Sequence, residues 1–244
     1  FYQQKNQIAA VILEPMNTHF PEDNFLQKVK DLCQQHDAVL IFDETITGFR
    51  FSMGGAQQLF NVTPDLATFG KGMANGYPIS AVVGRKDIMM LMEDIFFSGT
   101  FAGETLSLAA TKATLDFMTE HNVVTHLAAM GEKLQTGLAQ IINDLQAQHW
   151  LTLSGHPAWS FLVINAQGNY SAIELKSLFL QEMALRGFLL GGGHNLNYSH
   201  KSEDIEALLS AYKEVLNILL QTIKDKDFHN KFYGELLSPV FKVR

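Results

Sequence analysis

The sequence of 244 residues contains a single cysteine, Cys33, and therefore cannot form an intramolecular disulfide bond. This excludes the small scaffolds that depend on disulfides, and it fits a reducing compartment. We expect a cytoplasmic protein. Cys33 lies in a helical pattern of apolar residues, and we expect it in the core.

The sequence also has little positive charge. Eighteen lysines and arginines stand against 25 aspartates and glutamates, a formal net charge of −7, and no basic run is present. Proteins that bind nucleic acids use basic patches to neutralise phosphates, so we expect no nucleic-acid partner. No apolar run approaches the length of a membrane span, and we expect no membrane partner.

Metal-binding patterns are a further absence. Nine histidines are present, but none has the spacing of a metal site. His194 and His200 are six residues apart, unlike a helical pair, and we expect both in loops or at the surface. We therefore predict no metal centre.

Strand and helix patterns alternate in the first half of the chain. Residues 8–13 and 38–42 are apolar runs typical of buried strands in a parallel sheet, and residues 24–35 between them have helical apolar spacing. Residues 66–69 and 79–83 predict two further strands. A helix that joins two strands is typical of an α/β domain. Residues 45–64 predict a long irregular loop, and long loops in compact domains are usually functional.

The pattern changes near residue 124, and we expect two domains, residues 1–124 and residues 125–244. The pattern of residues 125–244 predicts a smaller α+β domain. Its predicted elements are strands at 151–153, 159–164 and 187–190 and helices at 171–186 and 202–224.

One lysine lies between glycines in the stretch LATFGKGMANGYPIS, residues 66–80. No acidic residue lies between Asp65 and Asp87, so Lys71 has no acidic sequence neighbour. Glycines let the backbone approach a bulky group closely. Lys71 is either a solvated loop residue or a catalytic amine that forms a Schiff base, because desolvation frees its lone pair.

Asp43 follows the predicted strand 38–42, at the carboxyl edge where α/β sheets place ligands. It could simply cap the next turn. The Asp43-Glu44 pair also fits the magnesium strand of a P-loop ATPase, but the required G-x-x-x-x-G-K-[ST] loop is not in this sequence. Asp43 and Lys71 both follow strands of one predicted sheet. A carboxylate and an amine on one edge are the groups that pyridoxal phosphate needs, for its pyridine nitrogen and its aldehyde.

Four motifs in order resemble the class III aminotransferases of fold type I: IAAVILEPM, AVLIFDETITGFRF, PDLATFGKGMANGYPISAVVGR and SGTFAGETLSLAA. The resemblance runs from about Ile8 to about Ala211. It is closest to the branch with glutamate-1-semialdehyde aminomutase and its sugar- and polysaccharide-pathway relatives.

The resemblance implies an α/β fold. Residues 1–124 would be part of the mostly parallel-sheet, pyridoxal-phosphate-binding large domain, and residues 125–244 the smaller C-terminal α+β domain. The implied activity is amino-group transfer with pyridoxal 5'-phosphate, as an aminomutase or a transaminase, on a small-molecule amino donor or acceptor.

Site residues follow from the resemblance one by one. Lys71 matches the Schiff-base lysine and Asp43 the carboxylate on the pyridine nitrogen. Thr45 falls where the family packs a side chain, usually valine, on the cofactor ring. Thr100, with the backbone amide of Gly99, matches the threonine that binds the cofactor phosphate of the neighbouring subunit, which implies a homodimer.

Three further residues are candidates for contact with the substrate. Glu14 matches an acidic residue that pairs with an arginine to gate substrates in relatives, although a solvated glutamate at a strand end is the alternative. Arg50 either meets a substrate carboxylate or has a structural role. Asn195 lies in a region that approaches the active-site mouth in relatives.

The phosphate cradle and the stacking aromatic residue precede the LEP strand in relatives, and this chain, which begins with Phe1, does not contain them. We expect that it lacks the family's N-terminal portion. Two alternative functions follow: an amino-sugar or keto-sugar transaminase of polysaccharide synthesis, and a truncated, catalytically incomplete domain of such an enzyme.

Overall fold

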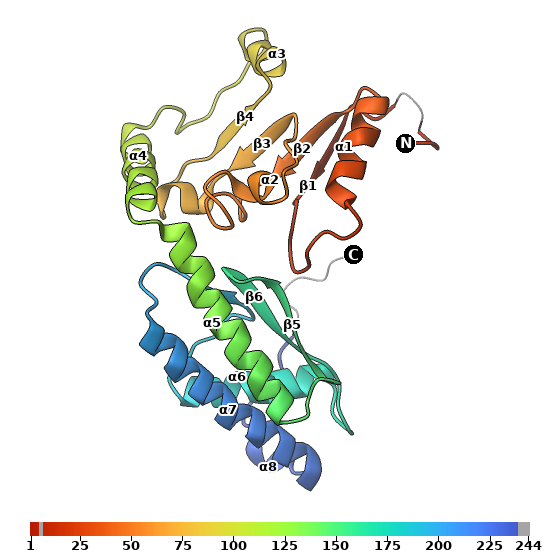
Figure 1. Ribbon diagram of the computed structural model, residues 1–244, viewed down its shortest axis with the longest axis vertical. Helices are drawn as coiled ribbons and strands as arrows, with labels where there is room; N and C mark the ends of the chain where they lie inside the picture. The colour runs from red at the N-terminus through yellow and green to blue at the C-terminus, as the bar shows by residue number, and fades with distance from the viewer. Residues whose placement is uncertain (5–6, 239–244) are drawn as a thin grey trace. The chain divides into compact units, whose positions relative to one another are not determined.

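The computed structural model describes residues 1–4 and 7–238 and divides into two compact units, Phe1–His126 and Leu127–Arg244 (Figure 1). The division falls within helix α5 (Val123–Asp144). The first unit has a four-stranded sheet in the order β1-β2-β3-β4, and the second has a three-stranded sheet in the order β5-β6-β7.

The first sheet is mostly parallel, which confirms the predicted α/β class. Its three parallel strands are β1 (Ala10–Leu13), β2 (Val39–Asp43) and β3 (Leu66–Phe69), and β4 (Ala81–Gly84) is antiparallel to β3. Helix α1 (Phe25–Gln35) connects β1 to β2 and packs on the sheet through Leu26 and Cys33. Cys33 is buried in this core, as expected.

The prediction that residues 8–13 are buried is wrong for Ala9, Ala10 and Ile12, which are exposed, Ile12 by 63%. Side chains alternate along a strand, so Val11 and Leu13 pack with α1 while Ile12 lies on the opposite face. Val82 of β4 is likewise 51% exposed. The apolar run predicted the strand correctly, but its prediction that both faces of the strand are buried is wrong.

Residues 45–64, predicted as an irregular loop, contain the short helix α2 (Gly55–Leu59). Its five residues are too few for a visible apolar period, and its first turn is held by a carboxylate more than ten residues upstream. The remaining elements of this unit are η1 (Lys71–Ala74), α3 (Lys86–Met89), η2 (Met90–Glu93) and α4 (Thr105–Glu120).

The second unit packs helices on an antiparallel sheet. Its strands are β5 (Leu151–His156), β6 (Trp159–Ile164) and β7 (His194–Asn195), and its further helices are α6 (Ala172–Leu185), α7 (Ser202–Asp225) and α8 (Phe228–Lys231). Ser171 caps α6 in a capping box with Glu174, as its position before the helix predicts.

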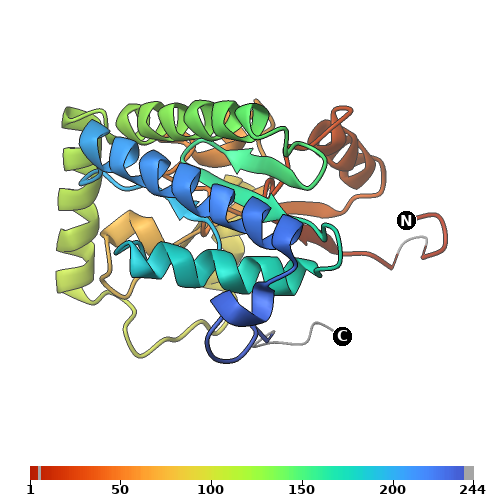
Figure 2. The ribbon, with the colours of Figure 1, turned by 90° about the horizontal axis from the view of Figure 1, so that it is seen from below.

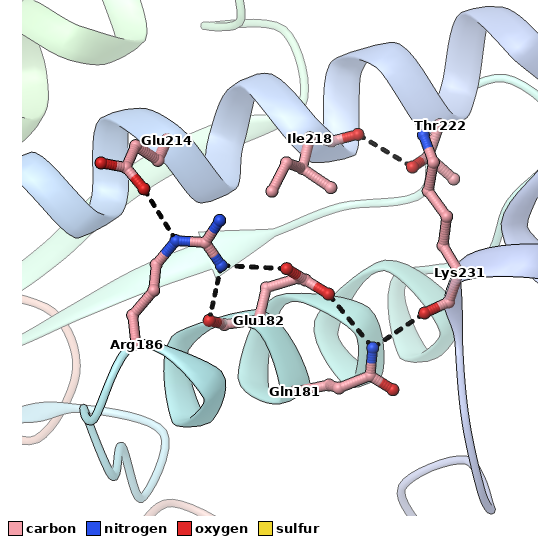
Figure 3. Close-up of polar contacts among 7 residues, drawn as sticks. All are labelled: Gln181, Glu182, Arg186, Glu214, Ile218, Thr222 and Lys231. Atoms are coloured by element: carbon pink, nitrogen blue, oxygen red, sulfur yellow. Dashed lines mark hydrogen bonds and ion pairs between the residues drawn. The ribbon is translucent and has the colours of Figure 1, made fainter.

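Helices α6 and α7 lie side by side (Figure 2). Figure 3 shows Arg186, just after α6, between two carboxylates: its Nη1 lies 2.9 Å from Glu182 of α6, and its Nε lies 2.9 Å from Glu214 of α7. Gln181 donates to the carbonyl of Lys231 at 2.8 Å and so ties α8 to the same helix pair.

The strand predicted at residues 187–190 is not formed. Gly187 has a φ of +83° after α6, and Leu189 is 95% exposed. The third strand is instead β7, where His194 pairs with Ser160. This pairing joins residues more than thirty positions apart, and a local apolar run cannot indicate it.

His194 is 6% exposed, so the prediction of a loop or surface position is wrong. Its Nδ1 lies 3.0 Å from the hydroxyl of Ser160, and its Nε2 lies 2.5 Å from the hydroxyl of Tyr212 in α7. Burial lowers the pKa of His194 to about 4 and raises the pKa of Tyr212. His194 is therefore neutral near pH 7.

None of the helices within residues 1–4 and 7–238 combines the length and apolar character of a membrane-spanning segment.

We predict that acid destabilises the second unit through His194. The unfolded chain takes up this proton near pH 6.5 and the folded chain only near pH 4, so the free energy of unfolding falls as pH drops between these values, by up to about 3 kcal/mol. Denaturant unfolding across this range measures the loss. His194→Gln should remove this part of the pH dependence, and His200→Gln should keep it. An unchanged pH slope in His194→Gln would contradict the assignment.

Candidate functional site

The candidate site lies where the parallel strands β2 and β3 end. Asp43 is the last residue of β2 and pairs with Thr68 of β3 in the register of the sheet. Lys71 comes two residues after Phe69, the end of β3. The two residues predicted to share one sheet edge therefore do so.

Hydrogen bonds hold the Asp43 carboxylate in place. Its Oδ1 accepts from the backbone amide of Thr45 at 3.0 Å and from the hydroxyl of Thr68 at 3.1 Å. The Thr45 side chain is the main cause that lowers the pKa of Asp43, with help from the Thr45 amide, Thr68 and the charge of Lys71, against the opposing effect of burial. Asp43 is therefore ionised at neutral pH.

Lys71 begins the 3₁₀ helix η1 and has a φ of +42°, in the left-handed region that non-glycine residues rarely adopt. It is exposed, as is Gly72, whereas Met73 and Ala74 in the same short helix are buried. A Cβ added at Gly72 or Gly76 would meet nothing within 4 Å. The backbone thus places an exposed lysine at the sheet edge that carries the Asp43 carboxylate, with open space beside the two glycines.

Thr45 completes this cluster. Its Cγ2 would lie 3.5 Å from a Cβ added at Gly70, the residue before Lys71. The Thr45 side chain therefore reaches from the end of β2 toward the lysine stretch. The structure brings together Asp43, Thr45, Thr68 and Lys71.

Glu14 lies at the same sheet edge. It follows Leu13, which pairs with Phe42 in the parallel register, so Glu14 stands at the level of Asp43. It is exposed and accepts from Asn17 Nδ2 at 3.1 Å.

Arg50 lies in the folded segment between β2 and α2. It is partly buried, and burial lowers the pKa of its guanidinium. The preceding Phe49 has a φ of +59°, and its ring centroid is 5.4 Å from that of Phe69 at the end of β3. This ring contact anchors the loop that contains Arg50.

Gly99 and Thr100 are exposed in the turn before α4. The carbonyl of Gly99 accepts from the amide of Ala102 at 3.1 Å, and Glu104 caps α4. Among the described contacts, none joins Thr100 to Asp43 or Lys71. Their predicted contact with the cofactor phosphate of a second subunit therefore stays a prediction.

Asn195 lies in the second unit. It pairs with Trp159 of β6 and lines a cavity of about 890 Å³ that also borders Phe161, Lys176 and Leu190. Its predicted contact with a substrate stays a prediction.

Sequence reasoning missed two residues of the site, Thr68 and Glu44. Thr68 stands opposite Asp43 only once β2 and β3 pair in register, which no local pattern indicates. Glu44 is buried, and strand alternation could have found it, because its side chain must point away from the face that Asp43 occupies.

We predict that Thr45→Val raises the pKa of Asp43 toward its ordinary value, because valine keeps the shape of threonine but removes the hydroxyl donor. Carbon-detected NMR titration of the carboxyl group measures this pKa. Thr45→Ser keeps the donor and should leave the pKa low. Equal titration of the valine and serine variants would rule out the Thr45 hydroxyl as the cause.

Comparison with known proteins finds relatives among the aminomutases. The glutamate-1-semialdehyde 2,1-aminomutase of Archaeoglobus fulgidus is 37% identical over 231 residues, covering 87% of this chain and 54% of the relative. The aminomutase of Alkaliphilus oremlandii is 36% identical, with 89% and 54% covered. The chain therefore spans about half the length of the curated relatives it matches.

Solved structures show the same fold. A transaminase with bound PLP superposes with a TM-score of 0.84 at 21% identity, covering 91% of this chain and 55% of the other. The PLP internal aldimine form of the Sphingopyxis FumI protein gives 0.82 at 24% identity, with 92% and 55% covered. The sequence model of the class-III aminotransferases matches residues 2–155, more than half of the chain, and the chain belongs to this family.

Proposed function

We propose that the protein takes part in pyridoxal-phosphate-dependent amino-group transfer, with Lys71 as the residue that carries the cofactor. The proposal rests on the sheet edge that Asp43 and Lys71 share, at the ends of strands β2 and β3, which pair in parallel. Family membership and the likeness to transaminase folds support it. Residues 1–124 then form the cofactor-binding part, and residues 125–244 form the small domain.

The residues present fit this cofactor. Asp43 is held ionised, as a partner for a protonated pyridine nitrogen must be. Thr45 lies between Asp43 and the lysine stretch, where its methyl group can pack on a flat ring. Pyridoxal phosphate, when bound, supplies an electron sink for the bond that breaks at the substrate carbon.

The remaining steps fall to the side chains of this chain. Lys71 would hold the cofactor through Nζ and would move a proton at the substrate carbon with the same atom. The hydroxyl of Thr100 and the amide of Gly99 would serve the cofactor phosphate of a second subunit. Glu14, Arg50 and Asn195 would contact the substrate.

The reaction proposed first is that of an aminomutase, because the relatives at 36–37% identity are named glutamate-1-semialdehyde 2,1-aminomutases. Incubation with glutamate-1-semialdehyde alone tests this. An aminomutase isomerises it without a second amino compound, whereas a transaminase needs an external donor and acceptor. Turnover of a keto-sugar instead would favour the polysaccharide-pathway alternative.

We predict that Lys71→Ala abolishes the visible absorbance band that forms when pyridoxal phosphate is added to the protein, because the covalent bond to Nζ is lost. Any amino-transfer activity should fall by at least about a hundredfold. Lys28→Ala, at an exposed position in α1, should keep the band. An absent band in the unsubstituted protein would favour the incomplete-domain alternative, and a persistent band in Lys71→Ala would contradict the assignment.

We also propose a homodimer in the cytoplasm. The single cysteine supports the location. Support for the dimer comes from apolar side chains around Thr100: Phe96, Phe97 and Phe101 are 96%, 71% and 67% exposed. A cluster of this kind is typical of a protein–protein interface.

The double variant Phe96→Ser/Phe97→Ser should therefore shift the protein from dimer to monomer in sedimentation velocity. Leu185→Ser, at the last residue of α6, which is apolar and 67% exposed, is the matched control and should remain a dimer. A monomeric unsubstituted protein, or an unaffected double variant, would show that this surface is not the dimer interface.

A further inference from the structure

Glu44 is a buried carboxylate directly beside Asp43. It is 1% exposed, although glutamate is among the residues least often buried. Its backbone continues the sheet, because its amide donates to the carbonyl of Thr68 at 2.9 Å. Since side chains alternate along a strand, Glu44 points away from the face that carries Asp43.

Each oxygen of the Glu44 carboxylate accepts hydrogen bonds. Oε2 accepts from the hydroxyl of Thr47 at 2.5 Å and from the amide of Ala56 at 2.7 Å, and Oε1 accepts from the amide of Gln57 at 2.8 Å. The carbonyl of Glu44 also accepts from the amide of Gly48 at 2.8 Å. One residue thus ties together the start and the end of the segment that joins β2 to α2.

The backbone is adapted to this carboxylate. Gly55 has a φ of +78°, and a Cβ added there would lie 2.4 Å from Glu44 Oε2. A Cβ added at Gly48 would lie 2.7 Å from the carbonyl of Glu44 and 2.5 Å from the ring of Phe69. Glycine at both positions lets the segment fold closely around Glu44.

The segment held in this way begins with Thr45. Its backbone amide donates to Asp43, and its hydroxyl is the main cause of the low pKa of Asp43. The hydrogen bonds from Thr45 to Asp43 therefore depend on the path of the backbone after Glu44. Arg50 lies on the same segment.

We propose that Glu44 is a positioning residue that fixes Thr45 and thereby holds Asp43 in the geometry needed to partner a cofactor ring nitrogen. The requirement for that geometry rests on the proposed function. The positioning itself is a property of the protein without cofactor. It can therefore be measured whether or not the cofactor binds.

The experiment compares Glu44→Gln with the unsubstituted protein. Both oxygens of a carboxylate accept hydrogen bonds, whereas the NH₂ group of a glutamine amide only donates. In the variant this NH₂ group would therefore face a hydroxyl or amide that now donates to Glu44. Amide exchange at Ala56 and Gln57 should become about tenfold faster. The pKa of Asp43, measured by carboxyl NMR without cofactor, should rise toward its ordinary value. Glu22→Gln, at an exposed glutamate, should change neither.

Thr47 provides a second pair of variants. Thr47→Val removes one donor to Glu44 and should shift the Asp43 pKa in the same direction by less, while Thr47→Ser should restore it. If Glu44→Gln lowered only the melting temperature and left the Asp43 pKa unchanged, Glu44 would be purely structural and the inference would be overturned.

Cofactor binding separates this inference from the proposed function. Glu44→Gln should weaken binding of pyridoxal phosphate about tenfold, and Asp43→Asn combined with Glu44→Gln should be no weaker than Asp43→Asn alone, because Glu44 acts through Asp43. Additive losses would overturn the inference. If the unsubstituted protein bound no pyridoxal phosphate, the proposed function would be refuted. The effect of Glu44→Gln on the pKa of Asp43 would still test the positioning role.

Discussion

The parallel pairing of β2 with β3 is the constraint on which the site depends. It sets Asp43 opposite Thr68 and delivers Lys71, two residues beyond the end of β3, to the same edge. A carboxylate and an amine that lie 28 positions apart in the sequence thereby become neighbours, and the charge of one acts on the other. Shifting this register by one residue would turn Asp43 toward the core and separate the pair.

Two adjacent carboxylates have opposite environments at this edge. Asp43 is partly exposed at the edge that also carries Lys71, whereas Glu44 is buried and accepts from Thr47 and the first turn of α2. Burial of a charge is costly unless hydrogen bonds compensate, and here three donors do so. The buried carboxylate holds the loop, and the loop supplies the Thr45 donors that help to keep the partly exposed Asp43 carboxylate ionised.

The sequence predicts the strands of the first unit and the pair Asp43 and Lys71, because apolar runs end at these residues and glycines mark the lysine stretch. It does not predict α2, which forms only when Glu44 accepts from its amides. The burial of His194 depends on pairing with a strand far along the chain. The exposure of Ile12 depends on whether another element covers the sheet face opposite α1. Each miss rests on the tertiary surroundings of a residue, which local periodicity does not contain.

We propose above that Lys71 is the amine that carries the cofactor. Borohydride reduction of the protein with bound pyridoxal phosphate, followed by proteolysis and mass spectrometry, tests it most directly, because reduction makes the covalent bond permanent. We expect one modified peptide, with the cofactor mass on Lys71. Modification of another lysine, with Lys71 unmodified, would contradict it.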